Sequence, residues 1–107
     1  MQKYTWDEME KEAMGGLMSR RFVTGEKLTL ARFELRKGGT AAIHQHDSEQ
    51  SSCVIEGALR FHIGGEETTL HAGQGLLIPS NVPHGVEALE DTVVLDIFSP
   101  IRRDWIK

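Results

Sequence analysis

The sequence predicts one all-β domain spanning residues 1–107, a β-sandwich or β-barrel with a short helix near its N-terminus. A chain of 107 residues is long enough for one hydrophobic core but not for two. After residue 16, short apolar segments recur about every ten residues, and turn residues such as glycine, proline and aspartate separate them. Several short strands at this spacing are typical of sandwiches and barrels.

The helix is expected at residues 6–14. Thr5 followed by Glu8 fits a capping box, in which the hydroxyl and the carboxylate each satisfy a free backbone N–H group. Gly15 and Gly16 would then end the helix.

The expected strands follow one another along the rest of the chain. Each is a short run rich in apolar or β-branched residues, bounded by turn residues. Their ranges are 17–23, 27–35, 41–46, 51–55, 58–63, 68–71, 75–78, 85–88 and 92–98.

The last of these strands carries an acid among apolar residues. Alternation places Asp96 on one face with Val94 and Phe98. The other face is wholly apolar and comprises Val93, Leu95 and Ile97. Either Asp96 lines a cavity while another layer covers the opposite face, or the strand lies at a subunit contact. Because the apolar row needs cover, we expect a homodimer.

Two histidines, His44 and His46, are separated by one residue. In a strand this spacing directs both imidazoles to one face, with Cβ atoms about 7 Å apart. They can converge on one ion if a third ligand arrives from a neighbouring strand. Standing alone, such a pair is as readily explained by two solvated strand residues.

The surrounding residues form two motifs of fixed spacing within residues 38–88. In the first, five residues separate Gly38 from His44, three separate His46 from Gln50, and six separate Gln50 from Gly57. In the second, five residues separate Gly73 from Pro79 and four separate Pro79 from His84. These stretches resemble the paired motifs of the cupin superfamily, in the same order. The resemblance implies a cupin-type antiparallel β-barrel, or jelly roll, with a divalent metal ion inside it.

Carried over by position, the implied metal ligands are His44, His46, Gln50 and His84. Gln50 stands where cupins usually have a glutamate, and Glu49 is the alternative ligand if the turn shifts register. Asn81 and Ala88 also depart from the family pattern, at positions that bind no metal. Asparagine can still adopt the positive φ that such a turn position requires.

An amide ligand would leave the ion with its full +2 charge. The ion would then be a stronger Lewis acid toward a hydroxyl or carbonyl. The site would also lack the anionic ligand of the facial triad found in non-haem iron oxygenases. Zn, Ni, Fe and Mn all remain compatible with imidazole donors.

The C-terminal segment contains Asp96, Phe98 and Arg102 in the pattern D-x-F-x-x-x-R. Together with Gln50, this resembles one subgroup of small cupins from pectin and alginate breakdown, which convert 4,5-unsaturated monouronates to linear keto forms. The resemblance implies that these three residues are needed for activity. Arg103 is the neighbouring candidate. The structural alternative is an ion pair between Asp96 and Arg102 that fixes the tail, with Phe98 in the core.

The chemistry of these residues suits a sugar acid. The guanidinium of Arg102 can pair with a carboxylate bidentately. A partly buried Asp96 would have a pKa raised toward neutrality and could move a proton to carbon. We therefore expect metal-dependent ketonisation or tautomerisation of an unsaturated uronate, with a metal-dependent dioxygenase or a non-catalytic binding cupin as alternatives.

Bulk composition excludes other classes of partner. The net charge is −4 and no basic stripe is present, so a nucleic acid partner is not expected. No segment approaches the roughly 20 apolar residues of a membrane span. Cys53 is the single cysteine, and the N-terminal residues carry acids where a signal peptide needs an apolar run. We expect a cytoplasmic protein.

Overall fold

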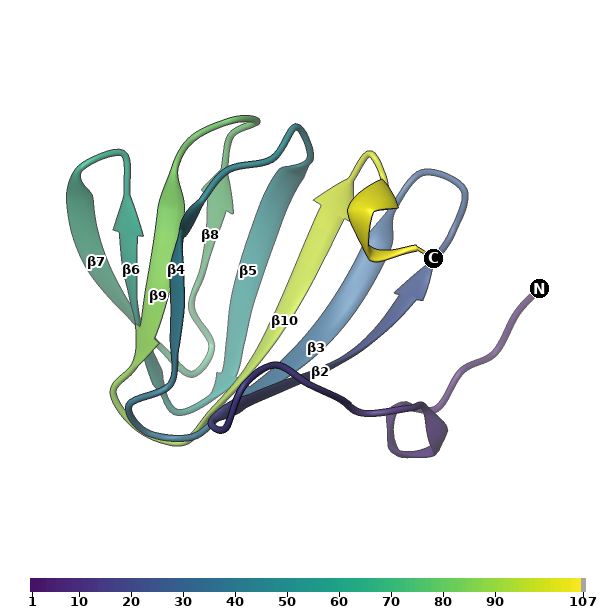
Figure 1. Cartoon of the computed structure of the whole chain (residues 1–107), viewed down its shortest axis with the longest axis horizontal. Coiled ribbons are helices and arrows are strands. Elements are labelled where there is room, and N and C mark those ends of the chain that lie inside the picture. The colour runs from purple at the N-terminus through teal and green to yellow at the C-terminus, as the bar shows by residue number, and fades with distance from the viewer. Residues whose placement is uncertain (107) are drawn as a thin grey trace.

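The computed structural model describes residues 1–106 and shows two antiparallel sheets facing each other (Figure 1). The first sheet has the strand order β1-β2-β3-β10-β5-β8, and the second has the order β4-β9-β6-β7. The strands of the first sheet are β1 (Glu12–Ala13), β2 (Met18–Thr24), β3 (Thr29–Leu35), β10 (Thr92–Ser99), β5 (Glu49–Glu56) and β8 (Gly75–Ile78). Those of the second are β4 (Thr40–His44), β9 (His84–Ala88), β6 (Ala58–Ile63) and β7 (Glu66–His71).

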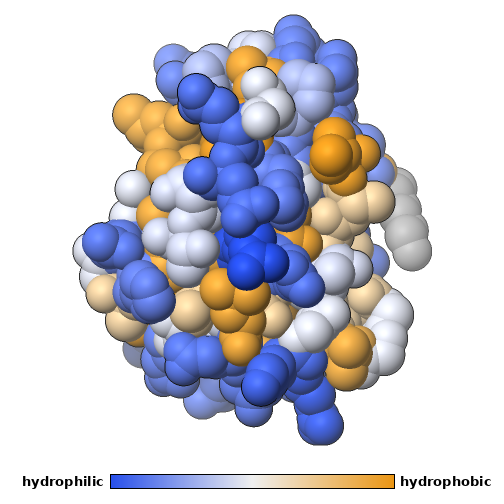
Figure 2. Space-filling model, turned by 90° about the vertical axis from the view of Figure 1, so that its left-hand side faces the viewer, coloured by the Kyte–Doolittle hydropathy of each residue, from blue (hydrophilic) through white to orange (hydrophobic). Residues whose placement is uncertain are grey.

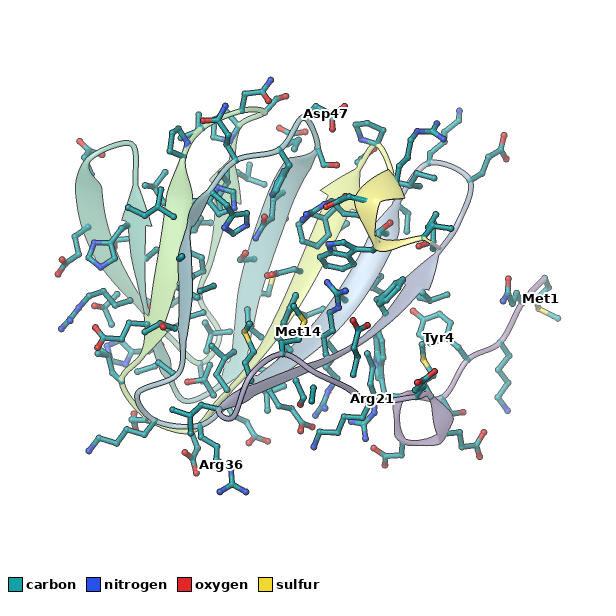
Figure 3. All side chains as sticks on the ribbon, viewed as in Figure 1. Met1, Tyr4, Met14, Arg21, Arg36 and Asp47 are labelled. Atoms are coloured by element: carbon teal, nitrogen blue, oxygen red, sulfur yellow. The ribbon has the colours of Figure 1, made fainter. Side chains whose placement is uncertain are left out.

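The predicted all-β architecture is therefore confirmed, and the expected strands are present with ends that shift by at most two residues. One shift matters for the site. The strand expected at 41–46 ends at His44, so His46 lies in the loop that follows β4. Asp47 marks the outer end of that loop (Figure 3).

The predicted helix at residues 6–14 is wrong. Only a single turn of 3-10 helix, η1 (Trp6–Glu8), forms there, and the Thr5 side chain makes no capping hydrogen bond. Glu12 and Ala13 instead pair with Arg20 and Ser19 of β2 as an added edge strand. Local helix propensity is a weak preference, and pairing with an existing sheet edge overrides it.

The hydrophobic core fills the space between the two sheets. Alternating residues of β6 and β10 point inward from opposite layers, and Phe61 and Val94 are almost fully buried. The core cluster comprises Leu35, Val54, Leu59, Phe61, Leu70, Ile78, Ala88 and Val94. Burial of each large side chain contributes about 1.5–3 kcal/mol to stability.

The outer faces differ between the sheets. Figure 2 views the side of β6 and β7, which is mostly hydrophilic, and the first residues of β7 are exposed glutamates and threonine. On the first sheet, Val93 and Leu95 are half-buried and Ile97 is 37% exposed. The homodimer that would cover this row stays a prediction. Among residues 1–106, no helix has the length and apolar character needed to cross a membrane.

The fold brings three distant segments to one end of the molecule. The β4–β5 loop, the β8–β9 loop and the C-terminal 3-10 turn η2 (Arg103–Trp105) lie together at that end (Figure 1). Strands β4 and β9 approach closely at Gly85, which has no side chain. A Cβ atom there would lie 3.0 Å from the carbonyl oxygen of Ala41. This approach places His44 directly opposite His84 in the strand register.

Candidate metal centre and adjoining cavity

Three histidines converge at this end of the molecule. His44 is the last residue of β4, His46 lies in the following loop, and His84 is the first residue of β9. One ring nitrogen from each lies within 4.8 Å of the others. This places the three rings close enough to converge on one ion, so the three residues predicted from the motifs are brought together.

Backbone carbonyls fix the orientation of all three rings. Nδ1 of His44, His46 and His84 donates to a carbonyl oxygen at 2.9, 2.8 and 2.8 Å respectively. A carbonyl can only accept, so Nδ1 carries the proton and Nε2 is left with a lone pair. Metal-binding histidines are commonly held in this tautomer by such a bond.

For His84, no donor within residues 1–106 pairs with the Nε2 lone pair. Nε2 of His84 is buried and has no hydrogen-bond partner among the described residues. Burial is the main cause that lowers the pKa of both His84 and His46, and the nearby charge of Arg102 lowers the pKa of His46 further. Both rings therefore stay neutral and offer lone pairs to a cation.

Gln50 completes the cluster. It is 5% exposed and directs its Oε1 to within 3.0 Å of Nε2 of His46, while Glu49 is exposed. With His46 in the tautomer given above, both of these atoms are acceptors and no proton lies between them. Two lone pairs that face each other fit a site for a cation, and a histidine and amide donor set accepts several divalent metals.

Ser52 explains why an amide suits position 50. The Gln50 amide nitrogen donates to the Ser52 hydroxyl oxygen at 2.9 Å, and this bond fixes which end of the amide faces the histidines. Ser52 lies opposite Asp96 in the β5–β10 ladder, and hydrogen bonding from its side chain lowers the pKa of that acid. A glutamate at position 50 would have no proton to donate to Ser52.

Asp96 is the buried acid that the sequence predicts in a cavity. It is 8% exposed, and its Oδ1 has no hydrogen-bond partner in the described part of the chain. Burial raises the pKa of Asp96 to about 7, although the Ser52 hydrogen bond and the charge of Arg102 oppose the shift. An acid with this pKa exists in both protonation states near neutral pH.

Phe98 and Arg102 lie beside the histidines. The Phe98 ring is buried with its centroid 5.5 Å from that of His46, and the Arg102 guanidinium lies 4.9 Å from the Phe98 centroid. Arg102 forms its ion pair with Asp104 rather than with Asp96. Arg103 is exposed, so Arg102 is the arginine at the site.

One cavity of about 350 Å³ connects the histidine cluster, through His44 and Gln50, with Asp96, Phe98 and Arg102. Its polar wall consists of Arg20, His44, Gln50, Asp96 and Arg102, and its apolar wall includes Met14, Met18, Phe33, Leu35, Leu59, Phe61, Val86, Val94, Phe98 and Trp105. Met14 projects from the N-terminal segment that crosses the open side of the sheets (Figure 3). A cavity of this size holds a small molecule of sugar dimensions.

Sequence reasoning missed Arg20, Ser52 and Trp105. Alternation along β2 could have shown Arg20, because it shares its face with Met18 and Phe22 and would be an isolated cation on an apolar face. Alternation could likewise have placed Ser52 beside Gln50. No local pattern marks Trp105, which reaches the cavity from a three-residue turn.

Comparison with known proteins defines the class. A model of the Cupin domain family matches residues 31–98, which is more than half of the chain. The chain belongs to the cupin domain family.

Within that class, the chain is similar to particular proteins over nearly its whole length. It is 32% identical over 103 residues to the pectin degradation protein KdgF of Dickeya dadantii (strain 3937), which covers 94% of each chain. The structure of KdgF from Halomonas sp. matches with a TM-score of 0.93 and 27% identity over 99% of both chains. An RmlC-like cupin from Shewanella frigidimarina NCIMB 400 matches with a TM-score of 0.90 and 28% identity, covering 96% of this chain and 94% of that one.

Proposed function

We propose that this protein ketonises a small unsaturated sugar acid, a 4,5-unsaturated monouronate, in a metal-dependent reaction of carbohydrate breakdown. One observation carries the proposal: His44, one of three clustered histidines, lines the same cavity as a buried acid and a buried arginine. Similarity to the pectin degradation protein KdgF over 94% of the chain supports the choice of a uronate.

The proposed reaction is an isomerisation. The anomeric hydroxyl loses its proton, the ring C–O bond breaks, and the anomeric carbon becomes an aldehyde. The electron pair of that bond stays on the former ring oxygen as an enolate, and the enolate becomes a ketone when its carbon takes up a proton. One proton is removed and one is delivered, so the reaction needs no oxidant and no second substrate.

Asp96 is the group suited to these proton movements. Its pKa of about 7 lets it accept a proton from a hydroxyl and donate one to carbon at neutral pH. Burial also keeps bulk water from its carboxyl group, and its Oδ1 has no partner among the described residues to compete with a substrate. Proton transfer by a positioned side chain typically accelerates a reaction by a factor of about 10²–10⁴.

The histidines and Gln50 would hold the metal ion. A divalent ion there would act as a Lewis acid that polarises a hydroxyl or carbonyl oxygen of the substrate. Arg102 would bind the substrate carboxylate through Nη1, the guanidinium nitrogen that Asp104 does not occupy. The face of Phe98 would support the sugar as an apolar wall.

The test follows the conjugated C=C absorbance of a freshly generated 4,5-unsaturated monouronate, with and without metal-loaded protein. The proposal expects the protein to accelerate the decay, and both His84→Ala and Asp96→Asn to lose the acceleration. His71→Ala and Asp7→Asn are matched controls on exposed residues and should behave as wild type. A decay at the spontaneous rate, with the metal confirmed in place, would reject the substrate.

A metal-dependent dioxygenase is the second candidate function. Three neutral imidazoles are also suitable ligands for iron. Oxygen consumption measured during the same reaction separates the two candidates, because ketonisation consumes none.

A further inference from the structure

We propose that Arg20 is a second substrate-binding residue, which shares the substrate carboxylate with Arg102 and makes the cavity selective for sugar acids over neutral sugars. This inference rests on the proposed function, because it assumes that the cavity takes a uronate. It assigns a role to a residue that neither the paired motifs nor the C-terminal pattern contains.

The position of Arg20 is unusual for an arginine. It lies on β2 and points inward between Met18 and Phe22, and it is only 9% exposed. Taking a guanidinium out of water costs several kcal/mol unless other groups compensate. Its neighbour Arg21 takes the opposite face and pairs with Glu34. An apolar residue at position 20 would continue the inward row without that cost, so the buried charge needs an explanation.

Arg20 is held in the same way as Arg102. Each arginine donates through Nε and Nη2 to the two oxygens of one carboxylate, Glu12 for Arg20 and Asp104 for Arg102. In both, Nη1 donates no hydrogen bond within residues 1–106. Each guanidinium is therefore fixed along one edge by an acid of its own and keeps one nitrogen for another acceptor.

Trp105 joins the two arginines into one structure. The guanidinium carbon of Arg20 lies 4.1 Å from the Trp105 ring centroid, and that of Arg102 lies 4.5 Å from the same centroid. All three residues line the cavity. Contact of a cation with an aromatic ring stabilises the cation without occupying its hydrogen-bond donors. The Trp105 ring thus contacts both guanidiniums and leaves Nη1 of each arginine available to donate a hydrogen bond.

A carboxylate is the ligand that such a pair recognises. Its two oxygens can accept from two guanidiniums at once, and each charge-assisted hydrogen bond is stronger than a neutral one. Glu12 and Asp104 are themselves carboxylates, but their side chains are 46% and 63% exposed. A substrate carboxylate inside the cavity would be better shielded from water and so would interact more strongly with both arginines.

The alternative is that Arg20 only supports Trp105. Binding measurements with two ligands of the same shape separate these roles. We would titrate metal-loaded protein with galacturonate and with its neutral C6 methyl ester by calorimetry, and compare wild type, Arg20→Gln and Arg102→Gln. Arg21→Gln is the matched control, because it removes the same charge from the adjacent position on the outer face of the same strand.

We expect Arg20→Gln to weaken binding of galacturonate at least about tenfold, because the substrate carboxylate loses a charge-assisted hydrogen bond. Binding of the ester should change less than about twofold. In the decay reaction, KM should rise more than kcat falls. Arg20→Lys keeps the charge but not the planar fork and should lie between wild type and Arg20→Gln. Arg21→Gln should match wild type.

Two results would overturn the inference, and they differ in what they leave standing. If Arg20→Gln weakens both ligands equally or neither, while Arg102→Gln removes the preference for the acid, Arg20 is a structural support and the proposed function stands. If wild type binds the acid no better than the ester, neither arginine recognises the carboxylate and the uronate proposal fails as well.

Discussion

The two ends of the cavity are built in different ways. At the histidine end, each imidazole is held by a backbone carbonyl two residues away in its own segment. At the arginine end, the contacts come from distant parts of the chain. The backbone N–H of Arg102 donates to the hydroxyl of Thr29, 73 residues away, and the Trp105 ring packs against Phe22 and Phe33. The contacts that orient the histidines are local in sequence, whereas the arginine end forms only when the N-terminal strands meet the C-terminal turn.

The two ends also carry opposite electrostatic character. The lowered pKa values of His46 and His84 keep these rings neutral, with lone pairs directed at one point. Arg20 and Arg102 present positive charge on the same cavity. A cation therefore suits the first end and an anion the second, which is the division that a metal-dependent enzyme acting on a sugar acid needs.

The largest effect is expected from removing one histidine. His84→Ala deletes a buried ring from the cluster, so metal affinity should fall at least about a hundredfold and the metal-dependent activity should vanish. Elemental analysis after dialysis measures the bound metal. His71→Ala, on the exposed end of β7, is the control. Full metal content in His84→Ala would show that the three histidines are not the metal centre.

Asp96 lies between the two ends, and its charge should make stability depend on pH. The pKa of Asp96 is raised from 3.8 to about 7, so the folded protein keeps a proton that the unfolded chain releases over that range. Stability should therefore fall as pH rises from about 4 to 7, by on the order of 4 kcal/mol. Asp96→Asn stays neutral and should lack this decline.

Urea denaturation of chelator-treated protein at pH 5 and pH 8 checks this prediction. Asp96→Asn should be the more stable protein at pH 8, and its advantage should shrink as the pH falls. Asp7→Asn, an exposed acid in η1, should follow wild type. An advantage of the same size at both pH values would mean that Asp96 does not titrate in this range.

A smaller effect is expected from changing the amide ligand. Gln50→Glu should hold the metal more tightly, because it adds a negative charge, but it should lower kcat about tenfold. The new carboxylate cannot donate to Ser52, and its charge would raise the pKa of the nearby Asp96 further. Gln45→Glu adds the same charge at an exposed position of the same loop and should leave kcat unchanged. Faster turnover in Gln50→Glu would contradict the role given to the amide.

The smallest effect is expected at the arginine end. Thr29 is fully buried, and Thr29→Val would leave the backbone N–H of Arg102 without its acceptor. Such a loss costs about 1 kcal/mol or somewhat more. We expect a lower melting temperature and a raised KM with metal content unchanged. Thr69→Val, a half-buried threonine on β7, serves as control. A loss of bound metal in Thr29→Val would show that the two ends are not independent.

The difference between local contacts at the histidine end and long-range contacts at the arginine end also decides what the sequence could predict. Motif spacing points to His44, His46 and His84 because their geometry is local to two short segments, and the structure brings these three together. Gln50 as the fourth ligand stays a prediction. Strand periodicity assigns His46 to the strand, whereas β4 ends at His44; the His46 ring nevertheless reaches the cluster from the loop that follows. The positive φ of Asn81 agrees with the expectation for that turn, and its backbone N–H fastens the loop by donating to the carbonyl of His46.

Contacts between distant segments could not be predicted. The helix expected at residues 6–14 failed because Glu12 and Ala13 pair with β2, which local propensity does not register. Arg20 and Trp105 meet only through packing of opposite ends of the chain. Asp96 was identified because an acid on a strand that is apolar on both faces is unusual within its own segment, whereas its link to Gln50 through Ser52 depends on the pairing of β5 with β10.

The measurement that tests the account most directly is the appearance of the linear keto product from a freshly released 4,5-unsaturated monouronate, followed by proton NMR in D2O with metal-loaded protein. We expect the keto form to appear faster than without protein, with deuterium at the carbon that receives the proton and no consumption of oxygen. Product formation at the spontaneous rate, by protein that holds its metal, would contradict it.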